Sequence, residues 1–139
     1  AELYLIGSNP TDQVIGLQSN SIHVTGYVTD EDLAAHYASA RVAVVPLRFG
    51  AGVKNKVVEA MAYGVPLITT PVGVQGLAGA EQIIPVVSEP QAFANAVCSV
   101  VASDEHWSTY SSDGNSYVAE RYSLSAMKAT LAQAFMDIK

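Results

Sequence analysis

Residues 42–66 read VAVVPLRFGAGVKNKVVEAMAYGVP. The nearly continuous apolar run 42–47 is typical of a parallel strand that is buried on both faces. The glycine loop, residues 48–53, follows it. A helix is then predicted from Lys54 to Tyr63, and Gly64 is a suitable C-terminal glycine for it. This strand–loop–helix order predicts one step of a βαβ unit.

The same alternation of strands and helices extends outward along the chain. Strands are also predicted at 3–6, 22–25, 65–70 and 83–87, and helices at 11–17, 29–40, 88–102, 105–121 and 123–138. This alternation predicts an α/β fold, a Rossmann-like parallel sheet with helices on both faces. In such sheets ligands bind beyond the carboxyl ends of the strands.

Length and composition exclude several classes of protein. The chain has 139 residues, half of them hydrophobic and 14% charged, which fits one folded domain and excludes disorder as the main state. No apolar run is long enough to cross a bilayer, and no basic segment precedes an apolar stretch at the start, so a cytoplasmic location is expected. The single cysteine, Cys98, excludes an internal disulfide, and its place on an apolar helix face predicts a core position.

The charges are distributed unevenly. The net charge of −6 argues against a nucleic-acid partner. Four of the seven Lys and Arg residues nevertheless lie between Arg41 and Lys56, and none occurs from Val57 to Glu120. An acidic chain that gathers its cations in one place is predicted to hold an anion there, although a solvated patch is the simpler alternative.

The residue types in and after the glycine loop suit a diphosphate. Gly50 and Gly52 allow close approach of a ligand to the backbone, and the helix that follows offers free N–H groups with a positive dipole end. Lys54 and Lys56 add charge, and Arg48 can supply a planar fork of donors. The loop matches neither the Rossmann fingerprint nor the Walker loop.

Glu59 stands in an otherwise apolar stretch of the predicted helix. A carboxylate there would be costly to bury without a partner. One interpretation is an ion pair with Lys56, three residues earlier. The other is a functional role, in which the carboxylate accepts hydrogen bonds from sugar hydroxyls, as acidic residues do for ribose in other nucleotide sites.

Five segments together resemble the C-terminal, donor-binding half of the retaining GT-B glycosyltransferases of group 1. They are Leu-Tyr-Leu-Ile-Gly (3–7), Ile-His-Val-Thr-Gly-Tyr-Val (22–28), the approach from Tyr37 to Pro46, Glu-Ala-Met-Ala-Tyr-Gly-Val-Pro (59–66) and Gly-Val-Gln-Gly-Leu (73–77). The resemblance implies a partial GT-B C-terminal domain and transfer of a sugar from a nucleotide-diphosphate sugar, without a metal or other cofactor. It also implies a hexosyltransferase type of enzyme.

The resemblance assigns roles to particular positions. Glu59 matches the ribose-binding second glutamate of the family's Glu-x7-Glu motif, and Val28 matches a region that contacts the base. The position of the first glutamate is Ala51, and the sequence instead resembles a subgroup with an Arg-x-Gly-x-Gly-x-Lys-x-Lys pattern, whose lysines face the phosphates. The full set of expected donor-binding residues is Val28, Arg48, Gly50, Gly52, Lys54, Lys56, Glu59, Gly73, Val74, Gln75 and Gly76, and no catalytic residue is assigned.

The resemblance also predicts what lies outside the chain. Residues 1–139 would be a nucleotide-sugar-binding domain that lacks its first strand–helix unit and the N-terminal domain, through which a sugar or glycan acceptor would bind. This chain alone is therefore expected to be inactive. A peripheral membrane contact of the full protein is left open. Two alternative functions also remain open, a non-catalytic nucleotide-binding module and a GT-B sugar-nucleotide epimerase.

The missing strand would be central in the doubly wound order. Its loss would leave the strands at 3–7 and 42–47 without their shared neighbour, and unpaired buried backbone groups are costly. We expect these two strands to pair directly. The alternatives are a partner chain that fills the gap or a longer protein of which this chain is a part.

Overall fold

The structure is a computed structural model that describes residues 1–136. The chain divides into two compact units, residues 1–36 and residues 37–139. The boundary between them lies within one helix, α2 (Asp30–Ser39). Each unit is described here by itself.

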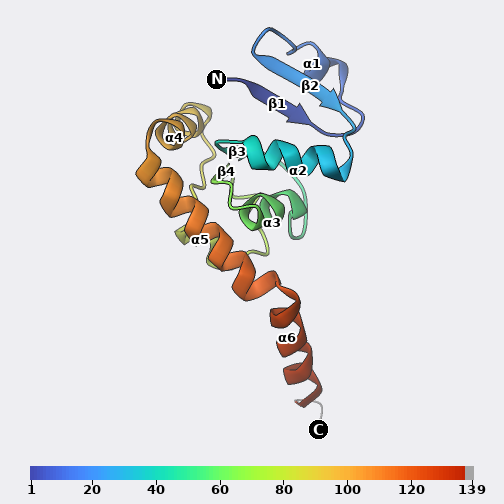
Figure 1. Cartoon of the computed structure of the whole chain (residues 1–139), viewed down its shortest axis with the longest axis vertical. Coiled ribbons are helices and arrows are strands. Elements are labelled where there is room, and N and C mark those ends of the chain that lie inside the picture. The colour runs from blue at the N-terminus through green and yellow to red at the C-terminus, as the bar shows by residue number, and fades with distance from the viewer. Residues whose placement is uncertain (137–139) are drawn as a thin grey trace. The chain divides into compact units, whose positions relative to one another are not determined.

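The first unit is a small βαβ arrangement. Strands β1 (Leu3–Ile6) and β2 (Ile22–Gly26) are parallel and lie side by side, and the short helix α1 (Asp12–Ile15) connects them (Figure 1). The register shifts by one residue near the end of the ladder, so that Leu5 is opposite Val24 but Ile6 is opposite Gly26. Both predicted strands are therefore present, and the predicted helix at 11–17 is shorter than expected.

Helix α2 begins where the sequence indicates. The Thr29 hydroxyl oxygen accepts a hydrogen bond from the Asp32 backbone N–H at 3.1 Å, which caps the helix. The three acidic residues that follow Thr29 lie in the first turn, where the helix dipole favours negative charge.

The second unit contains the remaining strands and five further helices within its described residues. Its strands β3 (Ala43–Val45) and β4 (Leu67–Thr69) pair in parallel, with Val44 opposite Ile68. Its helices are α3 (Asn55–Ala62), the 3-10 helix η1 (Ala80–Gln82), α4 (Pro90–Ala102), α5 (Asp104–Tyr122) and α6 (Leu124–Met136). The α/β class with parallel strands is confirmed.

The core of the second unit forms around β4 and α3. Leu67, Ile68 and Thr69 in β4 are all fully buried, as expected for a strand covered on both faces. The buried cluster at this strand comprises Val45, Val57, Ala60, Met61, Leu67, Leu77, Ala80, Ile84, Tyr117 and Val118.

Helix α5 packs along α3 (Figure 1). Close approach is possible because Gly114 has no side chain, and a Cβ there would lie 3.1 Å from Met61 Cγ. The Ser111 hydroxyl donates to the Gly64 carbonyl at 2.6 Å, and the Asn115 amide donates to the Ala62 carbonyl at 3.0 Å. Helix α5 thus binds the end of α3 and its terminal glycine, whose φ of +68° confirms the predicted C-terminal role.

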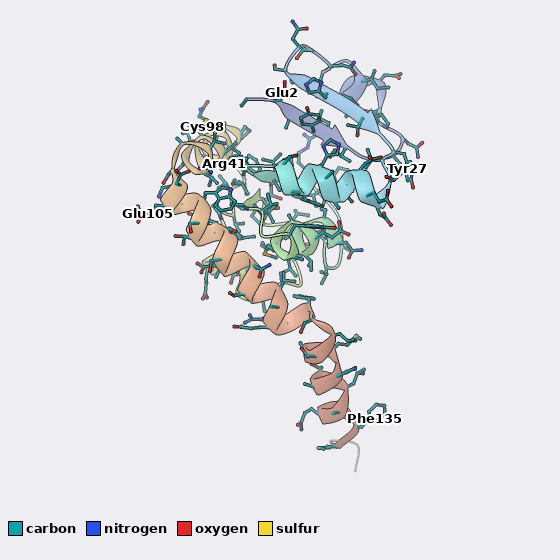
Figure 2. The ribbon with its side chains drawn as sticks, in the orientation of Figure 1. Glu2, Tyr27, Arg41, Cys98, Glu105 and Phe135 are labelled. Atoms are coloured by element: carbon teal, nitrogen blue, oxygen red, sulfur yellow. The ribbon has the colours of Figure 1, made fainter. Side chains whose placement is uncertain are left out.

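Helix α6 exposes its large apolar side chains, unlike the helices of the core. Leu124, Met127, Leu131 and Phe135 are each more than half exposed, and Phe135 projects from the helix in Figure 2. The predicted helix at 123–138 is confirmed to Met136, and its last two positions lie outside the described residues.

The direct pairing expected between residues 3–7 and 42–47 is wrong. In the described part of the chain, β1 pairs with β2 and β3 pairs with β4, in two separate two-stranded sheets. The pairing of β1 with β2 closes a shorter loop than pairing with β3 would, and a shorter loop costs less conformational entropy.

Two further sequence predictions need correction. The strand predicted at 83–87 is reduced to one bridge between Thr69 and Val86, since Pro85 has no N–H to extend the ladder. Cys98 is exposed rather than in the core. The inward face of α4 passes through Val97 and Val100 instead, and only Val100 is fully buried there.

Gly73 offers a test of the packing at the end of β4. A Cβ at this position would overlap Thr69 Oγ1 and lie 3.2 Å from Thr69 Cγ2, and Thr69 is itself fully buried. We predict that Gly73→Ala lowers the free energy of unfolding by about 1–3 kcal/mol, the usual cost of overpacking, measured by urea denaturation. Gly7→Ala is the matched control, because a Cβ at Gly7 meets nothing within 4 Å. Equal stability of the two variants would contradict this account.

Candidate donor-binding site

Two threonines join the carboxyl ends of β3 and β4. The Thr69 hydroxyl donates to the Val45 carbonyl at 2.8 Å, and the Thr70 hydroxyl donates to the Leu47 carbonyl. Thr69 is fully buried and Thr70 nearly so. The Val45 carbonyl also accepts a hydrogen bond from the Leu47 N–H at 2.9 Å. The two threonine hydroxyls thus add side-chain bonds at the point from which the glycine loop departs.

The glycine loop has a backbone that only glycine adopts readily. Gly50 has φ of +135° and Gly52 has φ of +71°. The Lys54 side chain folds back over the loop, and its Nζ donates to the Gly52 carbonyl. A Cβ at Gly50 would lie 3.3 Å from Lys54 Cε. The ammonium group is therefore held against the glycine backbone.

Helix α3 begins directly after the loop without a side-chain cap. Lys54 is its N-cap residue, and its side chain makes no capping hydrogen bond. In the first helical turn, the Val57 N–H donates to the Lys54 carbonyl at 2.9 Å, whereas the N–H groups of Asn55 and Lys56 have no intrahelical acceptor. These N–H groups lie at the positive end of the helix dipole. An anion placed beside the loop would meet these donors and the Lys54 ammonium together.

The four clustered cations separate into two groups. Arg41 precedes β3, at its amino end, where its guanidinium forms an ion pair with Asp104 and lies 5.5 Å from the Trp107 ring centroid. Trp107 Nε1 also donates to the Arg41 carbonyl at 2.9 Å. Arg41 therefore has a structural role, as does Trp107.

Arg48, Lys54 and Lys56 follow β3, at its carboxyl end. Within residues 1–136, none of these three cations forms an ion pair with a carboxylate. Arg48 and Lys56 are exposed and Lys54 is half-buried. Their charge is not neutralised by the protein, which is what an anion site requires.

Glu59 is exposed on α3, and the ion pair with Lys56 is absent from the described residues. The nearby aromatic residue is Tyr37, whose ring stacks on that of Tyr63 with centroids 4.8 Å apart. Burial raises the pKa of the Tyr37 phenol, and the negative charge of Glu59 and the neighbouring Tyr63 raise it further. The Tyr37 phenol, whose pKa is raised partly by the charge of Glu59, thus stays protonated at neutral pH.

A second loop, residues 71–79, contacts the chain just after the glycines. Gly76 has φ of +80°, and a Cβ there would lie 3.0 Å from Val53 Cγ2. The two loops predicted to bind the donor are therefore neighbours. Within the 71–79 loop, Gly73 is buried, Val74 is half-buried, and Gln75 and Gly76 are exposed.

Val28 is half-buried and belongs to the first unit, whereas the residues above belong to the second.

Sequence reasoning missed Thr69, Thr70 and Tyr37. The threonines could have been noticed, because two hydroxyl side chains at the end of a strand are suited to bind free carbonyls. Nothing in the sequence indicates that Tyr37 lies near Glu59.

Neither a metal cluster nor a membrane span is evident in the described residues. Across residues 1–136, no group of three or more His, Cys, Asp or Glu side chains is arranged to hold a metal ion. None of the helices in that range combines the length and hydropathy needed to span a membrane.

The comparison with protein families identifies the class. Residues 1–103 match the family described as glycosyl transferases group 1. This match covers most of the chain, so the chain belongs to the group 1 glycosyltransferases. No curated protein gives a significant match.

Two solved structures share the fold. Sucrose-phosphate synthase from Thermosynechococcus elongatus superposes on 99% of this chain with a TM-score of 0.79 and 26% identity. WaaG, a glycosyltransferase involved in lipopolysaccharide biosynthesis, covers 84% of this chain with a TM-score of 0.68 and 17% identity, a likeness in fold alone. The chain spans 38% of the first of these structures and 33% of the second. The fold is thus that of GT-B glycosyltransferases.

The exposure of Glu59 leads to a prediction about its role. We predict that Glu59→Gln changes the free energy of unfolding by no more than about 0.5 kcal/mol, the usual range for a surface substitution. The same change should weaken nucleotide-sugar binding about tenfold, because it would remove the charged acceptor that the sequence resemblance predicts for the ribose hydroxyls. Calorimetric titration and thermal unfolding measure the two effects. A large fall in melting temperature with unchanged affinity would indicate a structural role instead.

Proposed function

We propose that residues 1–139 bind the nucleotide-diphosphate sugar donor of a glycosyltransferase. The observation that carries this proposal is the Lys54 ammonium folded onto the Gly52 carbonyl, at the start of an uncapped helix and beside two unpaired cations. Membership of the group 1 glycosyltransferases supports it.

The diphosphate is proposed to lie on the glycine loop. Backbone N–H groups of the loop and of the first turn of α3 would donate to its oxygens, Lys54 and Lys56 would supply point charges, and Arg48 would supply a planar fork. Gly50 and Gly52 keep side chains out of this space, which permits the close approach that backbone donors need. In this proposal Arg48, Lys54 and Lys56 balance the negative charge of the diphosphate, so no metal ion is required.

The remaining contacts extend along the donor. Glu59 would accept hydrogen bonds from the ribose hydroxyls. The exposed residues Gln75 and Gly76 lie on the loop beside Val53 and would border the donor, with Gly73 and Val74 supporting them. Val28 would contact the base.

The full protein is proposed to transfer a hexosyl unit to a sugar or glycan acceptor. Both solved relatives are more than twice as long as the part that this chain covers. We propose that a domain outside residues 1–139 binds the acceptor and that a further strand–helix unit precedes β1. The donor site described here would then form one wall of the reaction site.

Thermal unfolding with added nucleotides tests the donor site. We predict that at least one of UDP, GDP, ADP or their sugar conjugates stabilises the chain by roughly 2.7 kcal/mol when present at 100 times its Kd. Lys54→Ala combined with Lys56→Ala should abolish most of this effect. Lys128→Ala, which removes a lysine from α6, is the matched control. Failure of all these nucleotides at millimolar concentration would refute the proposed function.

The separate acceptor domain leads to a prediction about activity. The 139-residue chain is expected to bind a donor but to transfer no sugar, because holding donor and acceptor in reacting geometry lowers the barrier by up to about 7–11 kcal/mol. A radiolabelled donor incubated with a panel of sugars and glycans measures this. Transfer by the purified chain above the rate of donor hydrolysis would contradict the prediction.

A further inference from the structure

Tyr117, near the end of α5, binds the 71–79 loop. Its side chain is 5% exposed, and its hydroxyl donates to the Ala78 carbonyl at 3.0 Å. The Arg121 guanidinium lies 4.3 Å from the ring centroid and holds the ring in place. Burial, as the largest influence, raises the pKa of Tyr117, so the hydroxyl stays a donor at neutral pH.

The hydrogen bond to the Ala78 carbonyl holds residues 76–78, and the other two residues of this segment are also constrained. Leu77, the preceding residue, is 1% exposed and belongs to the buried cluster. Gly76 is held in the left-handed region, and its carbonyl accepts a second hydrogen bond from α5, from the Tyr122 hydroxyl at 3.5 Å. Two tyrosines of one helix therefore bind carbonyls on either side of Leu77.

The segment in turn supports the glycine loop. Gly76 packs so closely on Val53 that an added Cβ would lie 3.0 Å from Val53 Cγ2 and 3.6 Å from the Val53 nitrogen. Val53 directly precedes Lys54, whose Nζ binds the Gly52 carbonyl. A continuous series of contacts thus leads from Tyr117 through residues 76–78 to the backbone that is proposed to receive the diphosphate.

We propose that Tyr117 is a positioning residue for the glycine loop. It acts through Ala78, Gly76 and Val53 and does not touch the donor. The effect on donor affinity rests on the proposed function, whereas the mechanical coupling of the two loops does not. The hydroxyl is the essential group, because the ring alone would fill the core without fixing the Ala78 carbonyl.

Amide hydrogen exchange of the 139-residue chain tests the coupling without any ligand. Tyr117→Phe keeps the ring and its stacking with Arg121 but removes one hydrogen bond. The control is Ser111→Ala, which removes another α5 hydroxyl-to-carbonyl bond, on Gly64. The amides to follow are those of Val57 and Val58, which donate to the Lys54 carbonyl directly after the glycine loop, at 2.9 and 3.3 Å. We expect their exchange to rise about 2- to 12-fold in Tyr117→Phe, as the loss of one hydrogen bond implies, and to stay unchanged in Ser111→Ala.

The same variants are then titrated with the nucleotide that wild type binds most tightly among UDP, GDP and ADP. Tyr117→Phe is expected to raise its Kd and Ser111→Ala to leave it unchanged. If wild type binds none of the three and none of their sugar conjugates, the proposed function fails, and the exchange result still decides whether the loops are coupled.

Two results would overturn the inference. One is equal exchange at Val57 and Val58 in wild type and Tyr117→Phe. The other is a rise that is uniform over the whole buried cluster, which would indicate general destabilisation. Should Tyr117→Phe fold poorly, Tyr122→Phe breaks the neighbouring bond on Gly76 and must produce a smaller rise confined to the same residues.

Discussion

The hydrogen bonds from two threonine hydroxyls to two strand-end carbonyls are the constraint on which the candidate site depends. β3 and β4 share a ladder of only three residue pairs, which is too short to hold the chain beyond it. Thr69 and Thr70 extend the connection past the ladder by binding the carbonyls of Val45 and Leu47. Without its bond to Val45, the fully buried Thr69 hydroxyl would be an unsatisfied donor, at a cost of about 1–3 kcal/mol.

The loops on either side of these threonines take their shape from the same point. Position 73 has no room for a side chain, because Thr69 lies directly against it. Glycine at this position lets the 71–79 loop turn tightly at the end of β4. That turn brings Gly76 against Val53 and presents the carbonyls of Gly76 and Ala78 to the tyrosines of α5. Hydroxyl groups of Tyr117 and Tyr122 thus hold the 71–79 loop, and that loop packs on the chain next to Lys54.

Much of this could be predicted from local sequence, because local signals determine helices and loops. The cap at Thr29, the terminal glycine Gly64 and the glycine loop all follow from short patterns and were correctly predicted. Pairing between strands could not be predicted in the same way, since it depends on which loop closes at least cost. Within the site, the residue types around Glu59 indicated a sugar-binding carboxylate, a role that stays a prediction. The influence of its charge on the Tyr37 pKa depends on the tertiary fold, which no spacing in the sequence reveals.

The unpaired cations at the carboxyl end of β3 also have an ionic-strength consequence. The whole chain carries a net charge of −6, so a doubly or triply negative ligand is repelled at long range. Attraction by Arg48, Lys54 and Lys56 prevails only near the loop, where the distance falls below the Debye length of about 8 Å at physiological salt. Added salt screens the distant repulsion as well as the local attraction. Capture of an anion at this surface is therefore a balance between two opposing fields, and the composition of the buffer decides which of them governs the rate of encounter.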